Sequence, residues 1–197
     1  MNSLAPKLEE WVAMWRVALP GFEVDSLWGE GPLRWAPLDV SPVGGDIEHQ
    51  DTEDDLAFRI LRLRSPDGSH ILDVDSYQSI EPDGDSLQVG GEPDSRCTLI
   101  DLTSKTEAIL QFCGTPCAFH WGVWLSPTRF AVGGWYDPNG FDQWWQGTLS
   151  IYSLRDSTVA EYRTRIVPVG DAARYSRAWH RWLLKRYRAL MASHPRT

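Results

Sequence analysis

The chain has 197 residues and a formal net charge of −8, and 42% of its residues are hydrophobic. This composition suits one folded domain, and most of the eleven Trp are expected in its core. No run of about 18 apolar residues is present, so no membrane-spanning segment is predicted. The first residues lack the apolar block of a signal peptide, and three Cys without a paired framework suit a reducing compartment. We therefore expect a cytoplasmic protein.

Charge is unevenly spread along the chain. From residue 171 onward there are seven Lys or Arg and one acid, a local charge of +6, so the remainder carries −14. Binding to nucleic acid needs clustered cations, and the acidic body excludes nucleic acid as an expected partner.

Residues 1–21 contain a predicted helix. Leu8, Trp11, Val12 and Trp15 fall at helical spacing, and Pro20-Gly21 ends the pattern. Residues 22–56 are rich in Pro, Gly and acids, which predicts an acidic irregular arm with a short strand near 33–40.

From residue 57 the apolar period changes to two, which predicts strands. Short turns separate them, so we expect a mainly β fold of two consecutive four-stranded antiparallel meanders, at 57–113 and 119–167. The strands are expected at 57–64, 69–76, 97–102, 106–113, 119–125, 129–136, 147–154 and 158–167. With a helix at each end, residues 1–197 are predicted to form a single domain.

The two meanders look like copies of one unit. Ser65-Pro66-Asp67-Gly68 aligns with Ser126-Pro127-Thr128, and Leu99-Ile100-Asp101-Leu102 aligns with Ile151-Tyr152-Ser153-Leu154. This pattern resembles the blades of β-propellers of the TolB or WD-repeat type over residues 57–167. The resemblance implies a four-strand unit and no particular function. Propellers close with about four or more blades. The alternatives are two sheets that pack without closing, several chains that complete a ring, and an ordinary β-sandwich or barrel.

The hairpin at 126–128 is expected to pair Leu125 with Arg129 and Trp124 with Phe130. Both of its faces would then be apolar, so it should lie between layers. His120 would share the face of Trp124, and Trp121 would lie on the other.

The clearest predicted helix spans 171–192. Tyr175, Trp179, Trp182 and Leu183 make its apolar stripe. A second stripe is cationic and contains Arg174, Arg177, Arg181, Lys185 and Arg188.

Several patterns could carry chemistry, and each also has a structural interpretation. Cys113, Cys117 and His120, with Cys97, have the atom types of a zinc site but an unfamiliar spacing, so no metal and no cofactor are predicted. Asp137-Pro138-Asn139-Gly140 resembles the start of a calcium loop but is expected to be a plain turn. Asp73 and Asp75 lie two residues apart on one predicted strand, so their side chains would point the same way. They could be catalytic carboxylates, or they could lie on the solvated face of an edge strand. Trp144-Trp145 could stack on a sugar or fold back into the core.

Acidic tracts are the strongest functional signal. Residues 39–55 and 65–95 hold seven and eight acids and neither holds Lys or Arg. They favour a recognition face for a basic protein partner, while solubility or pairing with the cationic helix remains open. The partner-binding candidates are Asp46, Glu48, Asp51, Glu53, Asp54, Asp55, Glu81, Asp83 and Asp85.

The hypothesis that follows is a non-catalytic protein-interaction module, with bacterial toxin-neutralising (immunity-like) proteins as one possible setting. The alternative is a carbohydrate- or small-ligand-binding β domain that uses Trp144 and Trp145. A hydrolase using Asp73, Asp75 or His120 is a third hypothesis, and self-association stays open.

Overall fold

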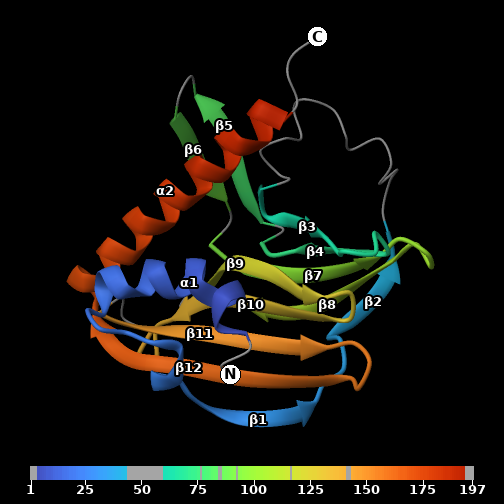
Figure 1. Ribbon diagram of the computed structural model, residues 1–197, viewed down its shortest axis with the longest axis horizontal. Helices are drawn as coiled ribbons and strands as arrows, with labels where there is room; N and C mark the ends of the chain where they lie inside the picture. The colour runs from blue at the N-terminus through green and yellow to red at the C-terminus, as the bar shows by residue number, and fades with distance from the viewer. Residues whose placement is uncertain are drawn as a thin grey trace.

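The computed structural model describes residues 4–43, 60–75, 77–83, 86–91, 93–115, 117–140 and 143–193. The predicted mainly β fold is confirmed, with antiparallel sheets and a helix near each end (Figure 1). Helix α1 (Ala5–Ala18) begins with a Pro at its start, and α2 (Val169–Ser193) follows the last strand. A short 3-10 helix, Val24–Ser26, follows α1.

Each predicted meander forms one sheet. Sheet A has the order β1-β12-β11-β10-β9, and sheet B has the order β2-β8-β7-β4-β3. The strands of the second meander are β9 (Cys117–Ser126), β10 (Arg129–Tyr136), β11 (Trp144–Ser153) and β12 (Thr158–Pro168). Those of the first are β3 (Arg62–Arg64), β4 (His70–Asp73), β7 (Ser95–Asp101) and β8 (Thr106–Cys113). All eight predicted strands are therefore present, although residues 57–59 lie outside the described residues.

The prediction of an irregular arm at 22–56 is wrong for its first part. It supplies β1 (Trp28–Arg34), which pairs with β12, and β2 (Asp39–Pro42), which pairs with β8. Each meander thus gains a fifth, outer strand from the same segment. The expected loop between the second and third strands is also wrong, because it contains a two-stranded hairpin of β5 (Gln78–Asp83) and β6 (Ser86–Gly91).

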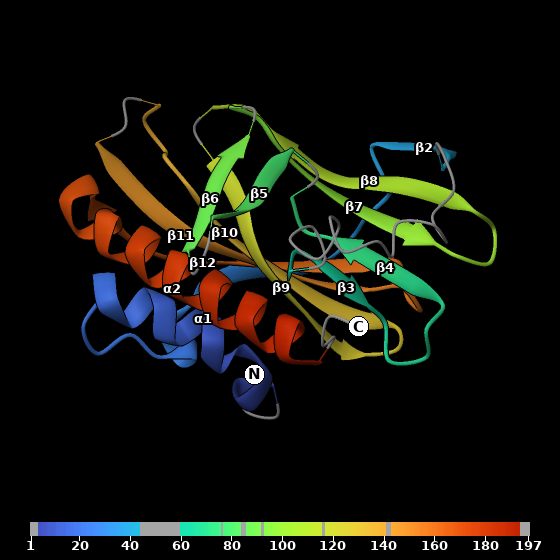
Figure 2. The same cartoon turned by 90° about the horizontal axis from the view of Figure 1, so that it is seen from above.

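Sheet A lies between the two helices and sheet B (Figure 2). Two glycines on neighbouring strands show how closely both layers approach it. A Cβ on Gly122 of β9 would meet Val74 and Leu72, which belong to the first meander. A Cβ on Gly133 of β10 would lie 2.4 Å from the Trp11 ring of α1. The prediction that β9 and β10 lie between layers is therefore confirmed.

Two bulges change the predicted register of this hairpin. Trp124 pairs with Phe130 as expected, but Arg129 pairs with Ser126, which leaves Leu125 as the extra residue. A second irregularity between Gly133 and Gly134 makes His120 the unpaired residue of β9. A bulge re-aims the side chain it carries. His120 therefore stacks on Trp179 of α2, while Trp124 donates a hydrogen bond to the Leu63 carbonyl of sheet B. The expectation that they share a face is wrong.

Helix α2 docks through the predicted stripe, since Tyr175, Trp179, Trp182 and Leu183 are buried. The Tyr175 ring stacks on Trp15 of α1 at 4.4 Å, and Trp182 donates a hydrogen bond to Glu10. The cationic stripe faces solvent along the opposite side, as the alternation of apolar and charged residues requires. Among the described residues, no helix is both long and apolar enough to cross a membrane.

Candidate functional site

Two of the predicted partner-binding acids are placed by the structure. Glu81 and Asp83 lie on β5, and both are exposed. The other seven candidates (Asp46, Glu48, Asp51, Glu53, Asp54, Asp55 and Asp85) lie outside the described residues. Among the described residues, the candidate site is therefore the β5–β6 hairpin, which stands beside α2 at the upper edge of Figure 1.

The hairpin has one apolar and one acidic face. Ile80 is buried and pairs across the hairpin with Val89, and both pack against the core with Leu87. Glu81 pairs with Gln88 and Asp83 with Ser86, and these four residues are exposed. Because side chains alternate along a strand, the acids lie together on the solvent side. We call Glu81 and Asp83 the acidic hairpin face.

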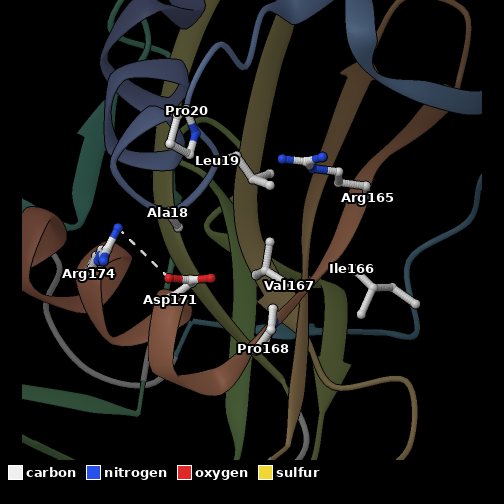
Figure 3. A pocket seen from close by; sticks show the side chains of 9 residues that line it. All are labelled: Ala18, Leu19, Pro20, Arg165, Ile166, Val167, Pro168, Asp171 and Arg174. Carbon is white, nitrogen blue, oxygen red and sulfur yellow. Dashed lines mark ion pairs between the residues drawn. The ribbon is translucent and has the colours of Figure 1, made fainter.

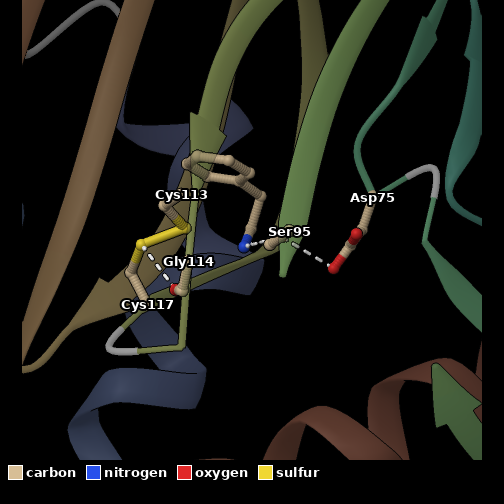
Figure 4. The surroundings of a disulfide bond; sticks show 6 residues. Asp75, Ser95, Cys113, Gly114 and Cys117 are labelled. Atoms are coloured by element: carbon tan, nitrogen blue, oxygen red, sulfur yellow. Dashed lines mark hydrogen bonds between the residues drawn. A yellow bond between two sulfur atoms is a disulfide. The ribbon is translucent and has the colours of Figure 1, made fainter. Parts of the chain in front are cut away.

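A buried polar chain fixes the root of the hairpin, immediately before β5 and after β6. The Ser95 hydroxyl donates to an Asp75 carboxylate oxygen at 2.9 Å and accepts from the Phe119 N–H of β9 at 2.9 Å (Figure 4). The Tyr77 N–H also donates to Asp75. Burial raises the pKa of Asp75 to about 6, against the opposing effect of these hydrogen bonds. Ser95 was not among the residues expected to matter.

The predicted carboxylate pair is buried, with Asp73 5% and Asp75 2% exposed. Asp73 is buried and forms an ion pair with Arg62 at 3.0 Å, and burial raises the pKa of Asp73. Cys97 is also fully buried, which together with Asp73 and Asp75 raises the pKa of its thiol. The expected solvated edge is wrong, because β4 lies between β3 and β7. The expectation that both carboxylates lie on one strand is also wrong, because β4 ends at Asp73 and Asp75 lies beyond it. Both carboxylates therefore have structural partners.

His120 is enclosed in an aromatic layer between sheet A and α2. Its ring lies 4.1 Å from Trp179 and 6.0 Å from Tyr175, in both cases nearly parallel. Burial, with a smaller effect of His180, lowers the pKa of His120 to about 3. The ring is therefore neutral at physiological pH and serves as a packed aromatic group.

Cys113 and Cys117 are joined by a disulfide across the turn between β8 and β9 (Figure 4). The expectation of three unpaired cysteines is therefore wrong, and the bridge links β8, the last strand of the first meander, to β9, the first strand of the second. Disulfides persist mainly in oxidising compartments, so the cysteines no longer support a reducing one. The cytoplasmic location stays a prediction. Within the described part of the chain, no cluster of His, Cys, Asp or Glu could hold a metal ion.

Asp137 forms a turn by a local hydrogen bond. Its carboxylate accepts the Asn139 N–H at 2.9 Å, the pattern of an Asx turn. Asp137 is also buried, with 1% of its surface exposed. Its side chain therefore supports the turn.

The two adjacent tryptophans of β11 point to opposite faces of the sheet, as consecutive strand residues do. Trp145 stacks on Trp135 at 3.9 Å, within the layer that α1 and α2 cover. Trp144 is 40% exposed. One ligand could therefore contact Trp144 but not both rings, which weakens the sugar-stacking interpretation.

A shallow hollow of about 360 Å³ lies where the end of α1 meets β12 and the start of α2 (Figure 3). Leu19 and Val167 are apolar side chains on its wall, and Arg165 reaches over it from one side. Asp171 and Arg174, on the other side, form a 3.8 Å ion pair. The hollow is open and contains no buried polar group, so we assign it no ligand.

The alternative interpretation of the acidic tracts is internal pairing with the cationic helix. Arg174 pairs with Asp171 of its own helix. Arg177, Arg181 and Lys185 make no ion pair with any described residue, and none reaches Glu81 or Asp83. The acidic hairpin face is therefore not neutralised by those three cations.

Comparison of the chain with protein-family models, curated proteins and solved structures found no match in any of the three.

Proposed function

We propose that this protein is a non-catalytic protein-interaction module that binds a basic protein partner through the acidic hairpin face. The observation that carries the proposal is the two-faced β5–β6 hairpin. Its apolar side chains are packed on the core, and Glu81 and Asp83 are exposed without a described cationic partner. A basic toxin is one class of partner that such a face would suit.

Three further observations support a binding role over a catalytic one. The paired carboxylates are buried with Arg62 and Ser95, and His120 is enclosed by aromatic rings. The net charge of −8 gives the surface a negative field that attracts basic proteins over a distance. Electrostatic attraction of this kind acts mainly on the association rate.

The test is charge reversal on the hairpin. The variant Glu81→Lys/Asp83→Lys should slow association with a basic partner captured from a lysate, and should raise its apparent dissociation constant by at least about tenfold. The matched control is Asp25→Lys/Glu161→Lys, which changes the net charge equally at two exposed acids elsewhere. Equal loss of binding in both variants would point to net charge alone and would remove the hairpin from the proposal.

Salt dependence provides a second measurement. The association rate of the wild-type protein should fall as ionic strength rises beyond about 0.15 M, where the Debye length is roughly 8 Å. The hairpin variant should show a flatter dependence. An association rate that ignores salt in both proteins would contradict an electrostatic face.

A further inference from the structure

Within the described residues, six strand edges end the three sheets. These are β1 and β9 in sheet A, β2 and β3 in sheet B, and the two strands of the hairpin. An unpaired edge is a template for another strand, and natural proteins usually blunt it with Pro, with charges, with short length or with a cover. The six edges differ sharply in this respect.

Four edges outside the hairpin are blunted. β1 contains Pro32 and ends at Arg34, and β2 begins at Asp39 and ends at Pro42. β3 has only three residues, two of which are Arg. On β9, the Phe119 N–H is already bonded to the Ser95 hydroxyl, and the strand contacts β7 and β3 of the first meander.

The two hairpin edges are not equivalent. β5 contains Pro82, which has no backbone N–H, and the Gln78 N–H is already bonded to the Asp75 carbonyl. β6 has the sequence Ser-Leu-Gln-Val-Gly-Gly, with no charge and no Pro. It is the unprotected edge of the described chain.

The register identifies which backbone groups face that edge. Asp83 pairs with Ser86 across a two-residue loop, and such a loop closes on a hydrogen-bonded pair. The next hydrogen-bonded pair is then Glu81 with Gln88. Leu87 and Val89 therefore direct their N–H and C=O groups away from β5.

We propose that β6 is a docking strand, to which an extended basic segment of a protein partner adds as a third strand of the hairpin. Leu87 and Val89 would supply the backbone hydrogen bonds. Strands lie about 4.8 Å apart, so long Lys or Arg side chains on the added strand reach across β6 toward Glu81 and Asp83. This inference rests on the proposed function and adds the mode of binding.

Charge selects this occupant over a second copy of the chain. Two hairpins joined through β6 would bring their acidic faces into one continuous sheet, where like charges repel. A basic segment would instead place positive charges beside these acids. Self-pairing is therefore an outcome that the experiment must detect.

The probe is a peptide of about ten residues with alternating Lys and Thr, blocked at both ends. The matched control peptide carries N-methyl groups on two Thr and two Lys residues, which keep the charge but block strand pairing along both edges of the peptide. A second control replaces Lys by Glu. Binding to the whole protein is measured together with hydrogen exchange at the amides of Leu87, Val89 and Ile80.

The Lys peptide should slow exchange at Leu87 and Val89 by at least about tenfold and leave Ile80 unchanged, and N-methylation should weaken binding about tenfold or more. Equal binding of the N-methylated peptide would overturn strand addition and leave the acidic hairpin face standing. If neither Lys peptide bound, both proposals would be overturned. Equal binding of the Glu peptide and the Lys peptide would also overturn both. Protection of Leu87 and Val89 that grows with protein concentration without peptide would overturn the proposal in favour of a second copy.

Discussion

Lys105 and Ser157 occupy equivalent positions in the two meanders, and both have a left-handed backbone, with φ of 55° and 49°. Each is the last residue of a four-residue turn, before β8 and before β12 respectively. Their separation, 157 − 105 = 52, equals the spacing of the aligned segments around Ile100 and Tyr152. The repetition thus extends to single backbone angles, and it supports the duplication inferred from the sequence.

Substitution of these two residues should reveal their backbone strain. Left-handed φ costs a non-Gly residue about 1 kcal/mol, although Gly also gains entropy in the unfolded chain. Lys105→Gly and Ser157→Gly should therefore leave stability unchanged or raise it by up to about 1 kcal/mol, and Lys105→Val should lower it. Urea unfolding measures the difference. A loss above about 1 kcal/mol in either Gly variant would show that the side chain matters more than the backbone.

Trp182 should be a large contributor to stability. It is 8% exposed, its N–H donates to Glu10 at 3.0 Å, and the Arg186 guanidinium lies 4.9 Å from its ring. Trp182→Ala should lower the free energy of unfolding by about 3–5 kcal/mol, because the variant loses buried apolar surface and leaves a cavity. The neighbouring exposed Arg181→Ala is the control and should change stability by less than about 0.5 kcal/mol. Similar unfolding midpoints for the two variants would mean that α2 is not docked through this stripe.

His120 and Asp75 should make stability respond to acid in opposite directions. Burial lowers the pKa of His120 from 6.5 to about 3, so between these values the unfolded chain binds a proton that the folded chain does not. His120 therefore destabilises the fold as pH falls, by up to about 1.4 kcal/mol per unit. Burial raises the pKa of Asp75 from 3.8 to about 6, so the folded chain binds the extra proton and gains stability as pH falls. The raised pKa of Asp73 acts in the same direction as that of Asp75.

The variant Asp75→Asn should expose the His120 effect. Between about pH 6 and 4 its stability should fall more steeply than that of the wild type, by up to about 1.4 kcal/mol per pH unit. Urea unfolding at three pH values measures both slopes. Parallel slopes for the two proteins would mean that Asp75 titrates normally in the folded state.

Thiol counting should distinguish the three cysteines. Cys97 is buried and its thiol pKa is raised, so the native protein should react with no thiol reagent. The denatured protein should react at one position without reductant and at three with it. Three reactive thiols without reductant would rule out the Cys113–Cys117 bond. Replacing both by Ser should cost at most about 2 kcal/mol, because the closed loop is short.

The strands that sequence reasoning found are those whose burial imposes a pattern. β9 and β10 are apolar on both faces and β12 alternates, so their periodicity was readable. β1 and β2 lie at the edges and expose Trp28, Leu33 and Val40, so no alternation of burial shaped their sequence. β5 carries Pro82 and two acids, which are turn signals in most settings. The sequence did contain a hairpin signal, because an Asp-Gly pair separates the apolar Ile80 of β5 from the apolar Leu87 and Val89 of β6.

The candidate site was predictable in composition but not in geometry. The acids at 81 and 83 identified the surface, because charges avoid the core. The role of Ser95 could not be read from the chain, because its partners Asp75 and Phe119 lie 20 and 24 residues away in sequence. The position of His120 depended on one bulge, and a single inserted residue reverses the direction of a side chain.

The segment that contains β1 and β2 ties the two meanders together and sets an order on folding. Trp28 pairs with Arg163, and Asp39 pairs with Ile109, so β1 must wait for β12 and β2 for β8. During synthesis from the N-terminus, this segment is made long before β8 and β12, the strands it pairs with. Contacts over such separations close slowly. The exposed Trp28 and Leu33 are then available to other chains in the interval, which makes the newly made protein most prone to aggregate before β12 is complete.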